Sequence, residues 1–450
     1  MCRFGLGSLE ISAERVLRFS FTDSEVGIEA LESEEFEWLS GMITAIDAPR
    51  IQAMNESRPE FLQQMSSLVA PWMEHYIQYE TNPAIDAFYE EAGILWSRQN
   101  RWTDAVPADA VIGGLPFGLY QAAVTIFHGW ALKHMDFVQA LLKKNGTSDF
   151  RNIITIWGEP AKHAEYLAAA LNIKLEDAAL IIDVLTLRAS DISTHLFEPQ
   201  SALPAFVKIG DGYFVLSIAG QLIGGEDSMT RELKLRFGAD WDRAVNGRES
   251  VFLNDLYGLF HSPRFFNLDR QVKIKSQGAL ITDIDAVVYD QETGTLALFQ
   301  LKWQDSFGGS MSRRNSKMKN LTGEGNQWVE RMTDWIGERS LNRLPAALGL
   351  EKELTTAIRD VRLFVIGRNF SRFSGPIAIT DSASWGTWPQ VVRLLNEFGR
   401  SGDPLQSLHD ALHLGSPVHR EVESPAELRF EIGQWAVVIV PPAAEQSGNT

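Results

Sequence analysis

The sequence contains a single cysteine, Cys2, among 450 residues. One thiol excludes an internal disulfide framework and any zinc site built from several cysteines. Chains without disulfides are typical of reducing compartments. The opening residues, MCRFGLGSLEISAER, also lack the apolar core of a secretory signal peptide. We therefore expect a cytoplasmic protein.

The sequence also lacks a long, uninterrupted apolar run. The nearest approach is residues 110–132, which contain no Asp, Glu, Lys or Arg. A membrane-spanning helix needs about 20 predominantly apolar residues, and Gly113, Gly114, Pro116 and His128 interrupt this segment. We expect it to form a buried helix, and no membrane span in the protein.

Basic residues are in the minority. With 41 Lys and Arg against 58 Asp and Glu, the formal net charge is −17, which argues against a surface that is basic throughout and binds nucleic acid by charge alone. One local cluster is the exception, because Arg313, Arg314, Lys317 and Lys319 fall within ten residues that contain no acid. The polar sequence around it predicts a mobile loop over residues 304–322.

Several catalytic motifs are missing. The sequence has no Gly-x-x-x-x-Gly-Lys-Ser/Thr phosphate loop and no Gly-x-Ser-x-Gly elbow. His409 and His413 have the four-residue spacing of a zinc-binding helix, with Asp410 where such enzymes carry glutamate. No third ligand is evident in the sequence, so a zinc protease is a minor alternative.

The strongest pattern present is a β-hairpin at residues 281–303, whose letters are ITDIDAVVYD, QETG and TLALFQLKW. Two apolar runs flank a short polar loop that ends in Gly294, as expected for a hairpin. Alternation places Asp283 and Asp285 on one face of the first strand, opposite Ile284 and Ala286.

In the second strand, Gln300 and Lys302 share a face, opposite Phe299, Leu301 and Trp303. A turn centred on residues 292–293 places Asp285 opposite Gln300 and Asp283 opposite Lys302. Buried charge is costly unless it is paired or binds a metal, and hard cations prefer carboxylate and carbonyl oxygens. The pattern predicts a divalent-metal site, or alternatively an exposed sheet face with an Asp–Lys pair.

Asp285 followed by Gln300-Leu301-Lys302 at the end of the next strand resembles the PD-(D/E)xK nuclease superfamily, in its Gln-x-Lys variant. The resemblance covers residues 248–370. It implies a restriction-endonuclease-like α/β core. The expected order of elements fits that core: a helix at 248–260, a strand at 271–275, the strand hairpin, a helix at 325–336 and a further strand at 361–366. Gln300 departs from the commoner acidic residue, and an amide oxygen is a weaker ligand for a hard cation than a carboxylate.

The resemblance also implies roles for particular residues. Asp285, Gln300 and Lys302 would be catalytic, and Mg²⁺ or Mn²⁺ would be held by Asp285, Gln300, Asp283 and Glu249, the last on the first core helix. An alternative for Glu249 is a first-turn acid favoured by the helix dipole. The residues expected to contact nucleic acid are Arg313, Arg314, Lys317, Lys319 and Gln327; the alternative for the basic cluster is a solvated loop.

The whole chain reads as an α+β multidomain protein. We expect a mainly helical domain at 1–197, with a short strand or hairpin at residues 9–21 and only helices after it. A β-hairpin and helical connector at 198–246, a nuclease-like domain with a central mixed sheet at 247–441, and a disordered tail at 442–450 would follow. The helical domain would supply recognition, a partner surface or a homo-oligomer contact.

The expected function is metal-dependent hydrolysis of nucleic-acid phosphodiesters, with DNA and endonuclease action favoured, as in a restriction or phage-defence effector. The alternative is a nuclease-like fold with weak or no catalysis, used for binding nucleic acid or as a protein scaffold.

Overall fold

The computed structural model describes residues 7–12, 14–21, 28–100, 105–146, 149–197, 203–210, 212–276, 279–305, 311–350, 356–373, 378–399, 402–414 and 427–440. The tail expected at 442–450 lies outside these residues. The chain divides into two compact units. We call Ser40–Arg248 the helical unit, and Met1–Leu39 with Glu249–Thr450 the sheet unit. None of the described helices is long and apolar enough to cross a membrane.

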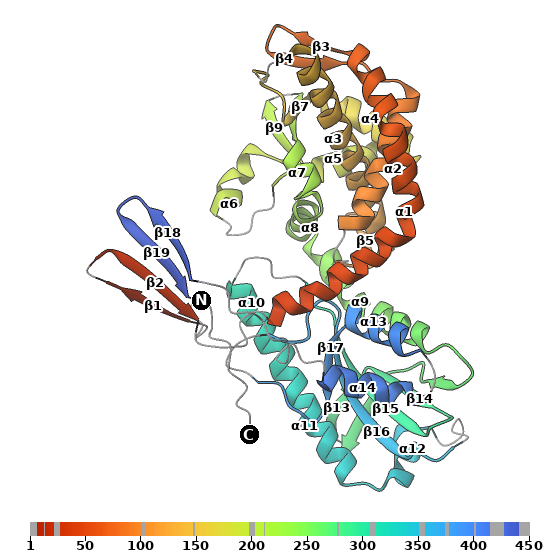
Figure 1. Ribbon diagram of the computed structural model, residues 1–450. Helices are drawn as coiled ribbons and strands as arrows, with labels where there is room; N and C mark the ends of the chain where they lie inside the picture. The colour runs from red at the N-terminus through yellow and green to blue at the C-terminus, as the bar shows by residue number, and fades with distance from the viewer. Residues whose placement is uncertain are drawn as a thin grey trace. The chain divides into compact units, whose positions relative to one another are not determined.

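The helical unit is built around α3, whose N-terminal half comes from the uncharged segment noted above (Figure 1). The helix ends at Gly146, where a positive φ of 65° lets the glycine N–H bond the Leu142 carbonyl. Helices α2 and α3 approach closely at Gly93 and Gly129, where an added Cβ would meet backbone of the facing helix. The helices are α1 (Ile28–Leu68, which begins in the sheet unit), α2 (Pro83–Asn100), α3 (Phe117–Asn145), α4 (Pro160–Leu171), α5 (Leu175–Val184), α6 (Ile192–Phe197), α7 (Ile218–Leu222), α8 (Gly225–Arg236) and the first half of α9 (Gly238–Leu259).

The prediction that only helices follow up to residue 197 is wrong, because strands lie among them, whereas the hairpin expected at 9–21 is present, with strands at Gly7–Ile11 and Val16–Phe21. Strands of the helical unit are β3 (Val69–Trp72), β4 (Tyr76–Tyr79), β5 (Val111–Ile112), β6 (Leu115–Pro116), β7 (Thr155–Gly158), β8 (Thr186–Leu187), β9 (Phe206–Gly210) and β10 (Tyr213–Ser217). The last four form one sheet in the order β7-β10-β9-β8. The boundary expected at 197 therefore falls inside a sheet, and the hairpin β9–β10 belongs to the helical unit.

The sheet unit contains a five-stranded mixed sheet in the order β11-β14-β15-β16-β17. Strands β11, β14 and β15 form an antiparallel meander, and β16 and β17 run parallel to β15. The strands are β11 (Phe265–Asn267), β14 (Ala286–Asp290), β15 (Thr295–Lys302), β16 (Asp360–Gly367) and β17 (Ser384–Thr387).

Both faces of this sheet are covered, which explains why β14 and β15 read as nearly continuous apolar runs. One face, with Leu298 and Val365, packs against helices α11 (Glu324–Gly337) and α12 (Leu344–Leu348). The other face, with Phe299 and Phe364, packs against the second half of α9 and against α13 (Trp388–Phe398) and α14 (Pro404–Leu414).

The first strand of the hairpin is broken at Asp285. Residues before the break form β13 (Ala279–Ile284), which leaves the main sheet and pairs with β12 (Val272–Ser276). Ile284 packs on the α11 side and Ala286 on the α9 side, so the expectation that they share a face is wrong. The strand expected at 271–275 is present as β12, but the edge of the main sheet is β11.

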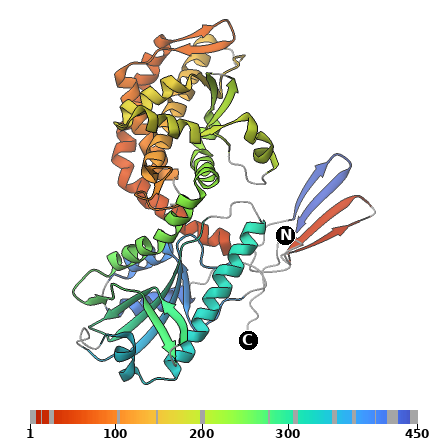
Figure 2. The same ribbon diagram turned by 180° about the vertical axis from the view of Figure 1, so that it is seen from behind.

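The loop expected at 304–322 is largely helical where the structure describes it. Helix α10 (Met311–Met318), a π-helical segment η3 (Lys319–Gly323) and α11 follow one another without a gap, as Figure 2 shows in cyan. Buried Met318 and Leu321 anchor the polar segment to the core. Polar composition alone therefore gave the wrong prediction for this segment.

A second sheet of the sheet unit joins the two ends of the chain. Its order is β1-β2-β19-β18, with β1 (Gly7–Ile11), β2 (Val16–Phe21), β18 (Leu428–Ile432) and β19 (Trp435–Val440). Strands β2 and β19 are parallel neighbours, with Val16 beside Ala436. We call it the terminal sheet.

Candidate active site

The candidate site lies where β14 begins and β15 ends. Ala286 pairs with Phe299, and the Asp285 N–H donates to the Phe299 carbonyl at 3.1 Å. This is the predicted register at Asp285, which comes opposite Gln300. The expected pairing of Asp283 with Lys302 is wrong, because β13 leaves the sheet and Asp283 lies opposite Lys273 of β12. Leu301 packs on the α9 side together with Phe299, so Gln300 and Lys302 continue the opposite side of β15.

The Asp285 carboxylate is surrounded by amide donors. Oδ2 accepts the Leu301 backbone N–H at 2.8 Å and a bond from Gln300 Nε2. Oδ1 accepts a longer bond, 3.4 Å, from Gln271 Nε2. Gln300 therefore presents its nitrogen to Asp285, and its oxygen would reach a shared cation only after the amide rotates.

The environment raises the pKa of Asp285 to about 6. Burial is the largest cause, because it disfavours the charged carboxylate. The Leu301 N–H and Lys302 act in the opposite direction, whereas Asp283 and Glu249 raise the pKa further by charge repulsion. Two of the predicted acids therefore act electrostatically on the third, Asp285.

Asp283 and Glu249 flank this carboxylate. Gln271 Nε2 bonds the Asp283 carboxylate at 2.8 Å as well as Asp285, so one amide bridges both acids. The Asp283 carbonyl accepts the Trp328 indole N–H at 2.6 Å, which ties the broken strand to α11. Glu249 is exposed on α9.

Lys302 is turned toward α11 rather than bonded to Asp285. Its Nζ lies 3.0 Å from Glu324 Oε2, with the Lys302 side chain 23% exposed and that of Glu324 60% exposed. Sequence reasoning missed both Glu324 and Gln271. The available signal for Glu324 was an acid in the first turn of a helix; Gln271 had none beyond its place at the start of an expected strand.

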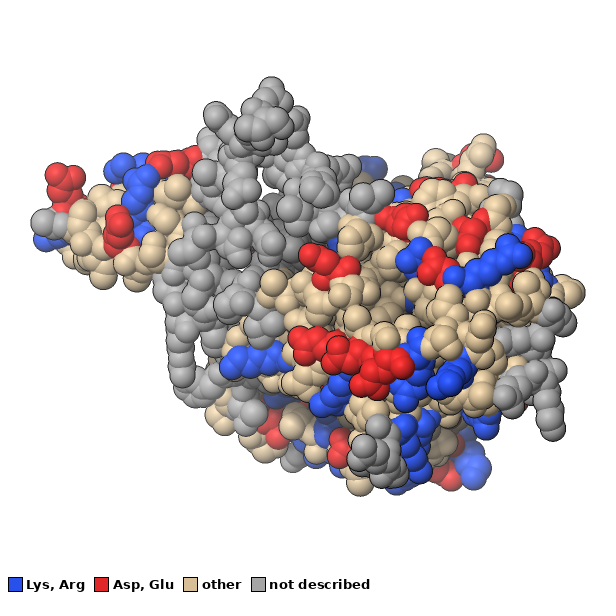
Figure 3. All heavy atoms as spheres, turned by 90° about the horizontal axis from the view of Figure 1, so that it is seen from below, with Lys and Arg blue, Asp and Glu red and all other residues tan. Residues whose placement is uncertain are grey.

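The predicted nucleic-acid contacts lie on the α10–η3–α11 segment. Arg313, Lys319 and Gln327 are exposed and Lys317 is half-buried, whereas Arg314 is buried with its guanidinium 5.6 Å from the Phe373 ring. Asp285 receives its hydrogen bonds from Gln271, Gln300 and Leu301, so this cluster lies outside the first contacts of the site. On the described part of the face in Figure 3, basic and acidic side chains are interspersed.

The donors fit a hard cation in kind, since they are carboxylates, an amide and the Leu301 carbonyl. Within the described ranges, however, no group of three or more His, Cys, Asp or Glu side chains is close enough to hold a metal ion. That result also applies to the zinc alternative: the His409 and His413 rings are stacked 6.1 Å apart, and burial lowers the pKa of His409.

The chain significantly matches no protein-family model, no curated protein and no solved structure.

Proposed function

We propose that this protein is a metal-dependent nuclease that hydrolyses phosphodiester bonds in DNA. The observation that carries the proposal is the convergence of Asp285, Gln300 and Lys302 at the ends of two paired strands. Gln300 bonds Asp285 directly, and Lys302 is near enough to lower the pKa of that carboxylate. Carboxylates with a strongly perturbed pKa and a neighbouring charge partner cluster at functional sites.

The strand order supports the resemblance to the PD-(D/E)xK superfamily. Helix α9, the antiparallel strands β11, β14 and β15, helix α11 and the parallel strand β16 follow one another along the chain. This is the order of elements that the resemblance implies. Glu249 on α9 also acts on Asp285, as the resemblance requires of an acid on the first core helix.

Asp285, with Asp283 or Glu249 assisting, would hold Mg²⁺ or Mn²⁺, and Gln300 and the Leu301 carbonyl would complete the ligands. When bound, the cation supplies a Lewis acid for the scissile phosphate and lowers the pKa of an attacking water. The Leu301 N–H fixes the orientation of Asp285, and Gln271 holds Asp283 and Asp285 together. Lys302 would orient the water or offset charge that develops on the phosphate.

The exposed residues Arg313 and Lys319, with Lys317 and Gln327, would contact the phosphate backbone. Arg314 would act indirectly, because its guanidinium packs on Phe373. Endonuclease action in restriction or phage defence is the context we propose for this chemistry, by analogy with the superfamily.

A second function has its own support: a nuclease-like fold that binds or scaffolds without cutting. In this arrangement Gln300 offers Asp285 a donor rather than a metal ligand, and Lys302 is paired with Glu324. Both contacts satisfy the site without a cation.

Cleavage assays separate the two functions. Supercoiled plasmid, linear duplex and single-stranded DNA are incubated with the full chain and Mg²⁺ or Mn²⁺, beside Asp285→Ala and Lys302→Ala. The matched controls are Asp334→Ala and Lys275→Ala, which alter exposed residues of the same unit. The proposal predicts metal-dependent cutting that falls by at least about 10²-fold in both site variants and persists in the controls. Cutting that survives Asp285→Ala, or a folded wild type that cuts none of the three substrates, contradicts it.

A further inference from the structure

The terminal sheet has one face that is apolar throughout its paired rows. One row across the four strands consists of Leu9, Phe19, Ile439 and Leu428, which are neighbours in the register. The next row, two residues along each strand, is apolar as well and runs from Ile11 to Phe430. Alternation therefore gathers these side chains on a single face.

That face is open to solvent in a single copy of the chain. Ile11 is 64% exposed, Ile432 63% and Leu428 52%. Antiparallel sheets commonly pack one face against a core and leave the other in water, and the face left in water is ordinarily the polar one. An apolar face of this extent is an interaction surface by composition.

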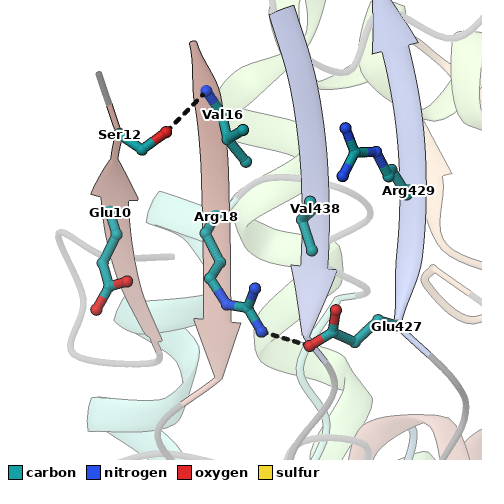
Figure 4. Close-up of a pocket in the computed structure, with 7 residues that line it drawn as sticks. All are labelled: Glu10, Ser12, Val16, Arg18, Glu427, Arg429 and Val438. Atoms are coloured by element: carbon teal, nitrogen blue, oxygen red, sulfur yellow. Dashed lines mark hydrogen bonds and ion pairs between the residues drawn. The ribbon is translucent and has the colours of Figure 1, made fainter. Parts of the chain in front are cut away.

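The opposite face carries the charges, as Figure 4 shows. Arg18 forms an ion pair with Glu427, and Arg429 bonds Glu431 at 3.0 Å. The side chains of Arg18 and Arg429 line the same shallow pocket as Val438, which is only 4% exposed. Long charged side chains cover apolar neighbours in this way, so the charged face needs no further partner.

The segments that adjoin the terminal sheet along the chain have too few apolar side chains to match the eight of the two rows; residues 1–6, MCRFGL, have four. Residues 22–27 read TDSEVG, residues 415–426 read GSPVHREVESPA, and residues 441–450 read PPAAEQSGNT. Each is short and mostly polar or proline-rich. None offers a run of apolar side chains that matches two rows across four strands.

We propose that a second copy of this chain covers the apolar face, so that two terminal sheets pack face to face about a twofold axis. A flat apolar face is self-complementary, as an isologous interface requires, and paired sheets pack about 10 Å apart with interdigitated side chains. The exposed fractions, applied to side chains of about 150–200 Å², give roughly 600 Å² of apolar surface per copy, close to the ~800 Å² of a standard interface.

The second copy is favoured over a partner of different chemistry because the two rows contain no charged or polar side chain that would select one. Every folded copy also has the same apolar face, because the sheet combines strands from the N-terminal and C-terminal parts of one chain. The proposal is independent of the nuclease activity.

The test is the mass of the full chain in solution, measured by light scattering and sedimentation between about 0.1 and 50 µM. Wild type is compared with the double variant Ile11→Glu/Ile432→Glu, whose positions are so exposed that a single copy tolerates the change. Arg429→Gln is the control, because it alters one charge on the opposite face of β18.

The expected result is twice the chain mass of 50.3 kDa for wild type and for the control. The double variant is expected at the chain mass, with a dissociation midpoint raised at least about 100-fold. A wild type that is monomeric throughout overturns the proposal. So does a dimer that persists in the double variant, since its interface is then a strand edge or another surface.

Discussion

Two aspartates flank strand β14: Asp285 directly precedes it and Asp290 is its last residue. Their carboxylates differ in what surrounds them. Asp290, at the C-terminal end, has a side chain that is fully buried and faces Arg264, whose Nε bonds Oδ1 at 2.8 Å. The Thr293 hydroxyl and the Glu292 N–H complete its partners at 2.8 and 3.0 Å. Burial acts to raise the pKa of Asp290, but these bonds outweigh it and the pKa is lowered.

Asp285, just before the strand, has no such cation in contact among the residues that the structure describes. Its donors are two side-chain amides and one backbone N–H, and Lys302 is bonded to Glu324 instead. The pKa of Asp285 is raised to about 6. The comparison indicates that the Asp290 end is a completed structural pair, whereas the Asp285 end keeps charge that a bound cation would offset.

The largest loss of stability is expected from removing the Asp290 side chain, which breaks its ion pair with Arg264. Asp290→Ala leaves the Arg264 guanidinium in a mostly buried position without its main partner. Breaking a buried ion pair from one side costs about 3–5 kcal/mol. Urea denaturation followed by tryptophan fluorescence should show that loss in the free energy of unfolding. Wild-type stability in Asp290→Ala would remove the structural half of the comparison.

The pKa of Asp285 is shifted in the opposite direction to that of Asp290, so the pH dependence of its contribution to stability is also opposite. Its folded pKa of about 6 exceeds the unfolded value of about 3.9, so the folded state binds the proton more tightly. The contribution of Asp285 to stability is present below about pH 4 and is lost as the pH rises through about 6. Two pKa units correspond to about 2–3 kcal/mol.

Asp285→Asn removes the loss of stability that wild type suffers as the pH rises through about 6. The variant keeps an oxygen that can accept the Leu301 N–H. The variant is expected to gain on wild type in free energy of unfolding between about pH 4 and 7 in the absence of metal. Urea titrations across that range give the difference. A constant difference at every pH would show that Asp285 titrates normally and that the two ends are alike.

Gln300→Glu sharpens the comparison by adding the acid that the superfamily more commonly has. A third close carboxylate is expected to raise the affinity for Mn²⁺ about tenfold, since carboxylates are better ligands for hard cations than amides. Without metal, the variant is expected to lose about 1–2 kcal/mol from repulsion with Asp285. Calorimetry and denaturation measure the two effects. Unchanged Mn²⁺ affinity would mean that Gln300 does not face the cation.

The smallest effect is expected from Glu324→Gln. Its pair with Lys302 is largely exposed at the glutamate, and exposed pairs contribute at most about 1 kcal/mol. Stability should change by less than that in thermal denaturation. A larger loss would show that the Lys302–Glu324 pair is a structural contact comparable to Arg264–Asp290.

Local pattern predicted the centre of the site because hairpin register follows from alternation and turn position. The pairing of Ala286 with Phe299 and the convergence of Asp285 with Gln300 both came from that rule. The break at Asp285 did not, because period-two alternation assumes an unbroken strand. Asp283 and Asp285 nevertheless share a hydrogen-bond donor, the side-chain amide of Gln271.

Long-range and context-dependent features could not be read in this way. The helix before Glu324 is polar, and the burial of Met318 and Leu321 in the folded core stabilises it. The terminal sheet pairs Val16 with Ala436, and nothing in either segment identifies its partner. The strands in the N-terminal part are short, and a two-residue strand such as β8 leaves no periodic signal.

Mn²⁺ binding to the full chain, measured by titration calorimetry, tests the central claim most directly. Wild type is compared with Asp285→Asn and with Asp334→Asn, an exposed acid of the same unit, at about pH 7.5 and about pH 5. The account predicts binding to wild type and to the control at the higher pH. It also predicts weaker binding at the lower pH, where Asp285 is protonated, and at least about tenfold weaker binding to Asp285→Asn. Equal affinity in wild type and Asp285→Asn, or no binding to the folded wild type, would contradict it.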